Sequence, residues 1–178
     1  MKVQDCMTRE FQSCRAGDSL NRAAQLMWEG DFGVVPVVDA GGGVVGMITD
    51  RDICMAAYTR GRPLHELGVE SAMAKQVATC SEQSTIETAL FLMREARVRR
   101  LPIVDREGRL CGILSLSDLA RAERADGLGG ARTRTEIAAV LGCLSQPGFA
   151  SPVTKTAATR PTSRKVGRLP CAAEPSAV

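Results

Sequence analysis

The sequence predicts an α/β protein of the α+β type, made of two β-α-β-β-α half-domains that are related by a pseudo-twofold axis. The chain matches itself without a gap when it is shifted by 66 residues, so that Met7 falls on Met73 and Gly46 on Gly112. Each copy holds a helical apolar stripe followed by two short β-branched runs. A copy of about 60 residues is marginal as an independent core, so we expect the two copies to bury each other.

The elements follow in the same order in both copies. A strand-like leading segment precedes a helix, whose apolar stripe is Leu20, Ala23, Ala24 and Met27 in one copy and Ile86, Ala89, Leu90 and Met93 in the other. Asp18 or Ser19 would cap the first of these helices, and Ser84 with Glu87 has capping-box spacing for the second.

A hairpin and a second helix complete each copy. The stretches "VVPVVDAGGGVVGMIT" and "LPIVDREGRLCGILS" are β-branched runs around a glycine-containing turn, a pattern typical of a hairpin. The stretches "DRDICMAAYTRG" and "LSDLARAERADG" predict helices that end at glycine. We therefore expect repeat 1 over residues 1–60, a linker over 61–68 and repeat 2 over 69–126.

The repeat stops after residue 126, and the rest of the chain differs in character. Residues 127–150 could form one short helix with Ile137, Val140, Leu141 and Leu144 on one face; its expected ends are Thr133 or Thr135 as the cap and Pro147 as the stop. From 127 onward seven Lys and Arg residues stand against two Asp and Glu. We expect residues 151–178 to be a disordered basic tail.

The composition excludes several kinds of site. One histidine and 3% aromatic residues exclude a site built on several histidines and an aromatic platform for single-stranded nucleic acid. No apolar stretch approaches the roughly 20 residues that a membrane span needs. Seven cysteines without a Cys-x-x-Cys pair favour a reducing, cytoplasmic location. We expect no metal site, and no nucleophile with a partnered base indicates an enzyme.

A heptad marks the end of each hairpin: "GMITDRD" from Gly46 and "GILSLSD" from Gly112. Both place a hydroxyl three residues before an aspartate, at a strand end where a helix begins. Such a place offers free backbone N–H groups and favours a phosphate, while a carboxylate suits a ribose diol. The pattern therefore predicts a nucleotide site, and the alternative is that each pair is only a helix cap with an acidic first turn.

Two gap-free repeats that end in this way, after "VVPVVD" and "RLPIVD" strands, resemble a pair of CBS domains, also called a Bateman module. The resemblance covers residues 3–126. It implies tandem CBS repeats with a cleft between them that binds an adenine ligand: AMP, ADP, ATP or S-adenosylmethionine. It also implies a stand-alone regulatory protein rather than an enzyme, without a catalytic cofactor, which forms a homodimer through its helices.

The resemblance assigns ligand contacts for a site at the second heptad. Asp118 would bind the ribose diol, and Ser115 and Ser117 the ribose or phosphate oxygens. Arg99 or Arg100 would reach phosphate, since a guanidinium fork fits phosphate oxygens. The adenine would lie near residues 8–12, from Thr8 to Gln12, and against the backbone from Gly33 to Val35.

A symmetry-related site is implied at the first heptad. Thr49 and Asp52 would take the ribose, Arg51 could reach phosphate, and the adenine wall would come from residues 73–77, between Met73 and Val77. This copy has Gly33 and Val34 where the other has arginines, so we expect the two sites to differ in affinity. Two other functions stay open: an interaction scaffold with vestigial clefts, and a nucleic-acid-associated factor acting through the basic tail.

Overall fold

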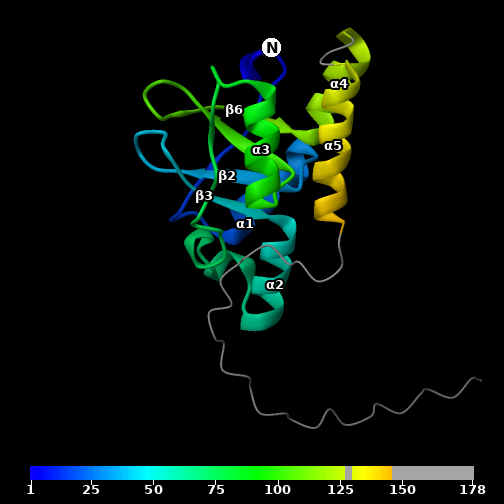
Figure 1. The fold of residues 1–178 in the computed structure, drawn as a ribbon. Helices are drawn as coiled ribbons and strands as arrows, with labels where there is room; N and C mark the ends of the chain where they lie inside the picture. The colour runs from blue at the N-terminus through cyan, green and yellow to red at the C-terminus, as the bar shows by residue number, and fades with distance from the viewer. Residues whose placement is uncertain (127–129, 146–178) are drawn as a thin grey trace, which may run out of the picture.

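The computed structural model describes residues 1–126 and 130–145, with side chains described for 1–124 and 134–145. The first repeat contains β1 (Cys14–Arg15), α1 (Leu20–Gly30), β2 (Val34–Val38), β3 (Val44–Thr49) and α2 (Asp50–Arg60). The second contains β4 (Cys80–Ser81), α3 (Ile86–Ala96), β5 (Arg100–Val104), β6 (Leu110–Ser115) and α4 (Leu116–Asp126), and α5 (Gly130–Leu144) follows. The predicted α/β class and the order of elements are confirmed (Figure 1).

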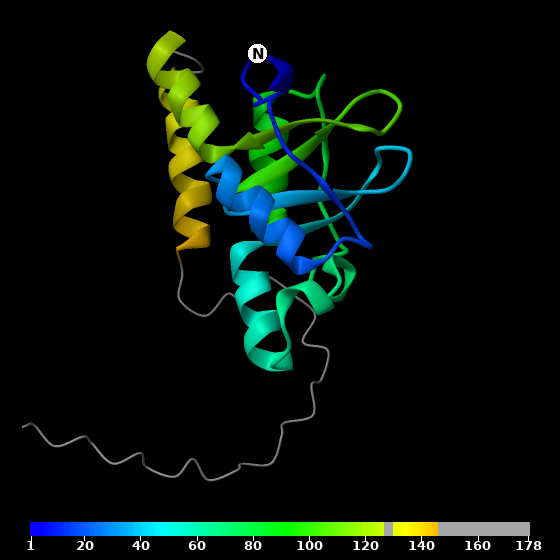
Figure 2. The same cartoon turned by 180° about the vertical axis from the view of Figure 1, so that it is seen from behind.

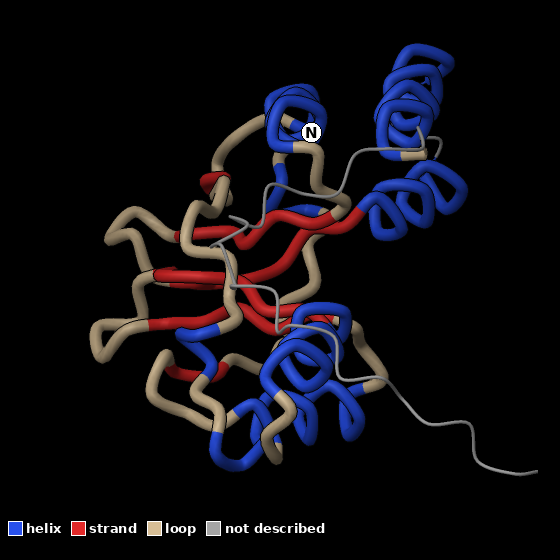
Figure 3. The backbone as a smooth tube through the Cα atoms, turned by 90° about the horizontal axis from the view of Figure 1, so that it is seen from below, coloured by secondary structure: helices blue, strands red, loops and turns tan. Residues whose placement is uncertain are grey.

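Each repeat contributes one three-stranded sheet, in the orders β1-β2-β3 and β4-β5-β6. The first pair in each sheet is parallel and the second pair is an antiparallel hairpin. A register shift falls at matching places, between Val37 and Val38 and between Ile103 and Val104. Figure 3 shows the strands in the middle of the molecule with helices on either side, and α2 and α4 run away from this centre in opposite directions (Figure 2).

The leading segments, residues 3–8 and 69–74, each lie on the other repeat. The family resemblance placed residues 8–12 and 73–77 on that side, whereas the residue pattern alone did not. Residues 3–5 form a 3-10 helix, η1 (Val3–Asp5), and Thr8 then exchanges two backbone hydrogen bonds of 2.9 Å with Ile113 of β6. The matching helix η3 (Val69–Ser71) is followed by the same exchange between Ala74 and Met47 of β3. The strands that follow, β1 and β4, are each only two residues long. The residues before them form the hydrogen bonds that connect the two repeats.

The first glycine of each heptad makes room for a methionine from the leading segment of the other repeat. A Cβ atom on Gly46 would lie 2.6 Å from Met73 Sδ, and one on Gly112 would lie 2.6 Å from Met7 Sδ. Because no real Cβ contact is this short, a side chain at either position would displace the methionine. Both glycines are therefore points of close packing between the two repeats.

Two aliphatic cores result, one for each sheet. The first holds Leu20, Ala23, Leu26, Met27, Val35, Val37, Ile48 and, from the linker side, Leu67 and Val69. The second holds Ile86, Ala89, Leu90, Met93, Leu101, Ile103, Leu114 and, from the N-terminus, Val3 and Met7. Cys14 and Cys80 are 3% and 2% exposed, as expected for small core residues.

The helix ends correct some expectations. Ser19 caps α1 by accepting a hydrogen bond from the backbone of Arg22, whereas Thr85, not Ser84, caps α3. Helix α2 ends at Gly61 in the left-handed conformation, as predicted. Helix α5 begins at Gly130, before both Thr133 and Thr135, so the predicted cap is wrong.

Helix α5 packs against α3 and α4 and so covers the outer helical face of the second repeat. Ile137 and Val140 are 8% and 2% exposed, while Leu141 on the predicted apolar face is 45% exposed. The linker contains a short 3-10 helix, η2 (Leu64–Glu66), with Leu67 buried behind it. The predicted tail over 151–178 and the stop at Pro147 lie outside the described residues.

Candidate functional site

A reciprocal capping box forms at the start of both α2 and α4. We call Thr49 and Asp52 the first-repeat corner, and Ser115 and Asp118 the second-repeat corner. The hydroxyl of Thr49 donates to Asp52 Oδ2 at 2.7 Å, and that of Ser115 donates to Asp118 Oδ2 at 2.6 Å. Each hydroxyl also accepts from the aspartate N–H at 3.1 Å, and each aspartate Oδ2 also accepts from the N–H of the hydroxyl residue.

This geometry corresponds to the capping alternative raised by the sequence, and it occupies only one oxygen of each carboxylate. The capping box holds each aspartate in one orientation, with Oδ2 turned to the backbone. The other oxygen, Oδ1, then decides what else the corner can bind. The two corners differ at this second oxygen.

At the second-repeat corner Asp118 is 8% exposed, and its Oδ1 has two protein donors. Thr8 donates its hydroxyl at 3.4 Å, and Arg121 donates a guanidinium N–H in an ion pair with the carboxylate. A pocket of about 260 Å³ is lined here by Cys6, Thr8, Asp118, Arg121 and Ala122. The corner therefore joins the leading segment of one repeat to a helix of the other.

Strand β5 brings Arg100, one of the two arginines predicted to bind phosphate, to the same corner. Arg100 is the direct cross-strand partner of Ser115, so the two side chains leave the sheet on the same face. Arg99, one residue earlier, accepts a hydrogen bond from the N–H of Leu116 through its main-chain oxygen at 3.1 Å. Both arginines and Ser117 are exposed. Of the two arginines, Arg100 has the better position for a ligand held at Ser115 and Asp118.

The first-repeat corner carries different neighbours on the same backbone. Val34 is the cross-strand partner of Thr49, and Ala74 takes the place of Thr8 in the exchange of hydrogen bonds with the strand. Arg51, predicted to reach phosphate, is exposed and its N–H binds the side chain of Asp50. This corner thus has a carboxylate but neither the threonine nor the strand arginine of the other.

The structure does not bring every predicted contact to a corner. Val35 is fully buried in the first core, which leaves only its main chain for a ligand, and Met73 packs over Gly46. Gly33 lies against Asp50 of α2. Within the described residues no hydrogen bond joins Gln12, Gly33 or Val77 to either carboxylate of the corners, so their assignment remains a prediction.

Sequence reasoning missed Arg121. The signal that could have found it is the spacing of an acid and a base three residues apart on one helix, at Asp118 and Arg121. A second signal is the break in the repeat, because Met55 stands at the matching position of the first copy.

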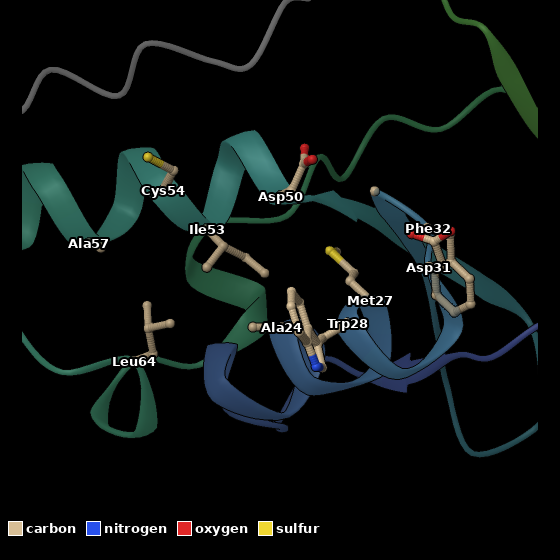
Figure 4. A pocket seen from close by; sticks show the side chains of 11 residues that line it. Ala24, Met27, Trp28, Asp31, Phe32, Asp50, Ile53, Cys54, Ala57 and Leu64 are labelled. Carbon is tan, nitrogen blue, oxygen red and sulfur yellow. The ribbon is translucent and has the colours of Figure 1, made fainter.

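A larger pocket, of about 480 Å³, lies between α1 and α2, and its lining includes Gly33 and Asp50 next to the first-repeat corner (Figure 4). Its lining is mostly apolar and includes Ala24, Met27, Trp28, Ile53, Ala57 and Leu64. Trp28 is 88% exposed, and Tyr58 on the same pair of helices is 82% exposed. The matching face of the second repeat is the one that α5 covers.

The thiols and acidic groups offer no second site. Burial raises the pKa of the Cys6 thiol to about 11, with a further rise from the nearby Asp5 and Asp118 carboxylates, so this thiol stays protonated at neutral pH. Within residues 1–124 and 134–145, no three His, Cys, Asp or Glu side chains gather where they could hold a metal ion. No helix in the described part of the chain is long and apolar enough to cross a bilayer.

Comparisons with known proteins agree with this architecture. The model of the CBS domain family matches residues 3–58 and 69–125. The chain is 36% identical over 118 residues to the CBS domain-containing protein YhcV of Bacillus subtilis (strain 168), which covers 66% of this chain and 82% of YhcV.

Two solved structures add ligand-bound relatives. The chain is similar to CBSX2 of Arabidopsis thaliana, solved in complex with AMP, at 27% identity and a TM-score of 0.60, covering 69% of this chain and 96% of CBSX2. It is similar to the CBS domain pair of protein MJ0100, solved with 5-methylthioadenosine and S-adenosyl-L-methionine, at 25% identity and a TM-score of 0.61, covering 68% and 94% of the two chains. The chain therefore belongs to the CBS domain family, and its two repeats form a CBS domain pair.

Proposed function

We propose that this chain is a regulatory module that binds an adenine nucleotide at the second-repeat corner, between its two repeats. The observation that carries the proposal is the meeting of three chemistries at one place. Thr8 supplies a hydroxyl from the leading segment, Asp118 a carboxylate at a helix start, and Arg100 a cation from the neighbouring strand. The carboxylate can accept hydrogen bonds from a ribose diol, and the arginine together with the helix N-terminus can bind a phosphate.

In the proposed complex each part of the ligand has its own partner. The ribose hydroxyls donate to Asp118 Oδ1, and the phosphate lies near Arg100 and the first N–H groups of α4. The adenine lies against the segment from Thr8 to Gln12 and the main chain of Gly33 to Val35. The AMP and S-adenosyl-L-methionine complexes of similar CBS pairs support the ligand class, which here is AMP, ADP, ATP or S-adenosylmethionine.

The proposed role is regulatory rather than catalytic, without a catalytic cofactor. A ligand that touches Thr8 and Asp118 at once binds only one relative setting of the two segments well. It therefore shifts the population of settings by its differential affinity. The open face of α1 and α2, with Trp28 and Tyr58 exposed, is the surface through which we propose that a homodimer forms or a regulated protein docks.

Isothermal titration of the full chain with AMP, ADP, ATP, adenosine and S-adenosylmethionine tests the proposal. We expect saturable binding of at least one of them, with the affinity reduced tenfold or more in Asp118→Asn, because about 1.4 kcal/mol per tenfold is within the value of one charged hydrogen bond. Asp52→Asn is the matched control, since it changes the same capping box in the other repeat. Circular dichroism of both variants confirms that the helices are retained.

Two results would contradict the proposal. If no adenine ligand binds the wild-type chain, the interaction scaffold becomes the better function. If Asp118→Asn and Asp52→Asn lose the same small amount of affinity, the second-repeat corner is not the site. Salt-sensitive binding of RNA that disappears on deletion of residues 151–178 would favour the nucleic-acid alternative.

A further inference from the structure

We propose that Arg121 competes with the ligand for Asp118 and thereby sets the affinity of the second-repeat corner. The inference rests on the proposed function, because it concerns the same carboxylate. It adds a residue that controls access to the site from within the protein. The argument starts from how many donors the carboxylate of Asp118 already has.

The carboxylate of Asp118 is fully engaged before any ligand arrives. Its Oδ2 accepts from the N–H of Ser115 at 2.8 Å and from the Ser115 hydroxyl at 2.6 Å. Its Oδ1 accepts from Thr8 and from Arg121. A carboxylate oxygen offers about two lone-pair positions, so these four donors fill both oxygens. A ribose diol can bind only by replacing one of them.

Arg121 is the donor that a ligand can replace at least cost. The two Ser115 bonds are part of the capping box that starts α4, and losing them would weaken the helix. Thr8 is fixed by its backbone exchange with Ile113. The side chain of Arg121 is 69% exposed, so its guanidinium can turn into water and remain solvated. Asp118 itself is 8% exposed, but the ribose hydroxyls that replace the guanidinium at Oδ1 keep its carboxylate hydrogen-bonded.

The first-repeat corner shows the same carboxylate without the competitor. Asp52 Oδ2 accepts the same two capping bonds, from the N–H and the hydroxyl of Thr49. Met55 occupies the position that matches Arg121, and Ala74 the position that matches Thr8. Within the described residues no side-chain donor reaches Asp52 Oδ1. The chain thus carries an internal control for the effect of one arginine.

Adenosine is the probe that isolates the competition, because it has the ribose diol but no charge. We expect Arg121→Met to bind adenosine about twofold to fivefold more tightly than wild type, the factor that corresponds to an ion pair of this exposure. The affinity is measured in chains that also carry Asp52→Asn, so that any adenosine binding observed comes from the second-repeat corner.

Salt provides a readout that a purely structural role would not move. Raising NaCl from about 0.05 M to about 0.5 M screens the Arg121–Asp118 pair and is expected to tighten adenosine binding to the chain that retains Arg121. The Arg121→Met chain is expected to show little salt dependence, since the ligand is uncharged. The unliganded Arg121→Met chain should melt no higher than wild type, which separates tighter binding from general stabilisation.

The outcomes distinguish failure of this inference from failure of the proposed function. If neither adenosine nor AMP binds the wild-type chain, the proposed function is wrong, and the inference falls with it. If wild type binds but Arg121→Met leaves the affinity unchanged, only the competition is disproved. If Arg121→Met binds AMP more weakly, Arg121 contacts the ligand rather than competing with it, and the inference is overturned.

Discussion

The two corners of this CBS pair have the same backbone and different chemistry. In both, a hydroxyl and an aspartate form a reciprocal capping box with hydrogen bonds between 2.6 and 3.1 Å. Around the second carboxylate lie Thr8, Arg100 and Arg121; at the matching positions of the first lie Ala74, Val34 and Met55. The shared residues start a helix, so the diverged residues are the ones that can give each corner its own ligand preference.

The outer helical faces differ in the same way. The face of α3 and α4 is covered by α5, whose Arg134 pairs with Glu123, a side chain that is 13% exposed. The face of α1 and α2 is contacted by the short 3-10 helix η2 and leaves Trp28 exposed. Within the described residues the two repeats thus differ: α5 covers the outer helices of one, and Trp28 is exposed on the outer helices of the other.

The largest effect is expected where α5 closes the second repeat. Val140→Asp would place a carboxylate in a site that is 2% exposed, without a partner. We expect α5 to leave the face of α3 and α4, with a loss of about 3 kcal/mol in the free energy of unfolding. In a chain of this length this corresponds to a fall in Tm of about 6–12 °C. Thermal melts and limited proteolysis within α5 measure it.

Trp28→Ala is the control on the open face. Because Trp28 is 88% exposed, we expect its removal to change stability by no more than about 0.5 kcal/mol in an isolated protomer. A loss comparable to that of Val140→Asp would show that the α1 and α2 face is also buried in solution. The contrast between the two faces would then not hold.

Changes at the two heptad glycines are expected to come next in size, and to differ. The three atoms nearest to a Cβ on Gly112 all belong to the Met7 side chain, which can shift, whereas a Cβ on Gly46 also lies 3.0 Å from the backbone oxygen of Ala74. We expect both alanine substitutions to destabilise by about 1–3 kcal/mol, with Gly46→Ala the worse. Urea unfolding of the two variants measures the difference. Equal losses would mean that the methionine, not the backbone, sets the cost in both repeats.

Removing the cap hydroxyls should have a smaller effect. Ser115→Ala and Thr49→Ala each lose one helix cap, which costs about 0.5–2 kcal/mol. We expect Ser115→Ala to lie at the upper end, because Asp118 is 8% exposed and is left with one donor fewer in a buried position. Denaturant midpoints of the two variants test this order. A larger loss for Thr49→Ala would show that burial of the aspartate does not decide the cost.

The internal repeat made most of this fold predictable, because each residue of the first copy could be compared with its counterpart in the second. Helical stripes such as the one around Met93, and hairpins around glycine turns, depend on local periodicity that one chain displays on its own. The exchange of leading segments does not follow from the residue pattern, since Val3 and Val69 satisfy the same pattern on either repeat. Only the family resemblance pointed to it, by placing residues 8–12 and 73–77 at the other repeat's heptad. Only three-dimensional packing selects between the two.

The candidate site was predictable in part for the same reason. Ser115 and Asp118 are marked by their spacing, whereas Arg99 and Arg100 were assigned together from the family resemblance. Arg121 was missed because its role arises from the orientation that the capping box gives to Asp118. Side-chain orientation of this kind is set by hydrogen bonds in the folded state, which spacing alone does not define.

The smallest expected effect concerns the turns of the two hairpins. Asp105 Oδ1 accepts from the N–H of Arg109 at 2.8 Å and from that of Glu107 at 2.9 Å, and Oδ2 accepts from the Arg109 side chain at 3.0 Å. The backbone hydrogen bond from Arg109, then the hydrogen bond and charge of its side chain, lower the pKa of the Asp105 carboxyl below its ordinary value. In the first hairpin Asp39 has the two backbone donors, but Gly43 stands in place of Arg109.

A carboxyl whose pKa is lower in the folded state stabilises the fold above its unfolded pKa, and this contribution is lost as the pH falls through the folded value. Because Asp105 is partly exposed and lies in a surface turn, we expect the loss to be slight and confined to the acidic end of the range. In Arg109→Ala the pKa of Asp105 should rise only part of the way to its ordinary value, since the backbone donors remain. Carboxyl titration by NMR measures both chains. A full return to the ordinary value would mean that the arginine side chain, and not the turn that both hairpins share, holds the charge.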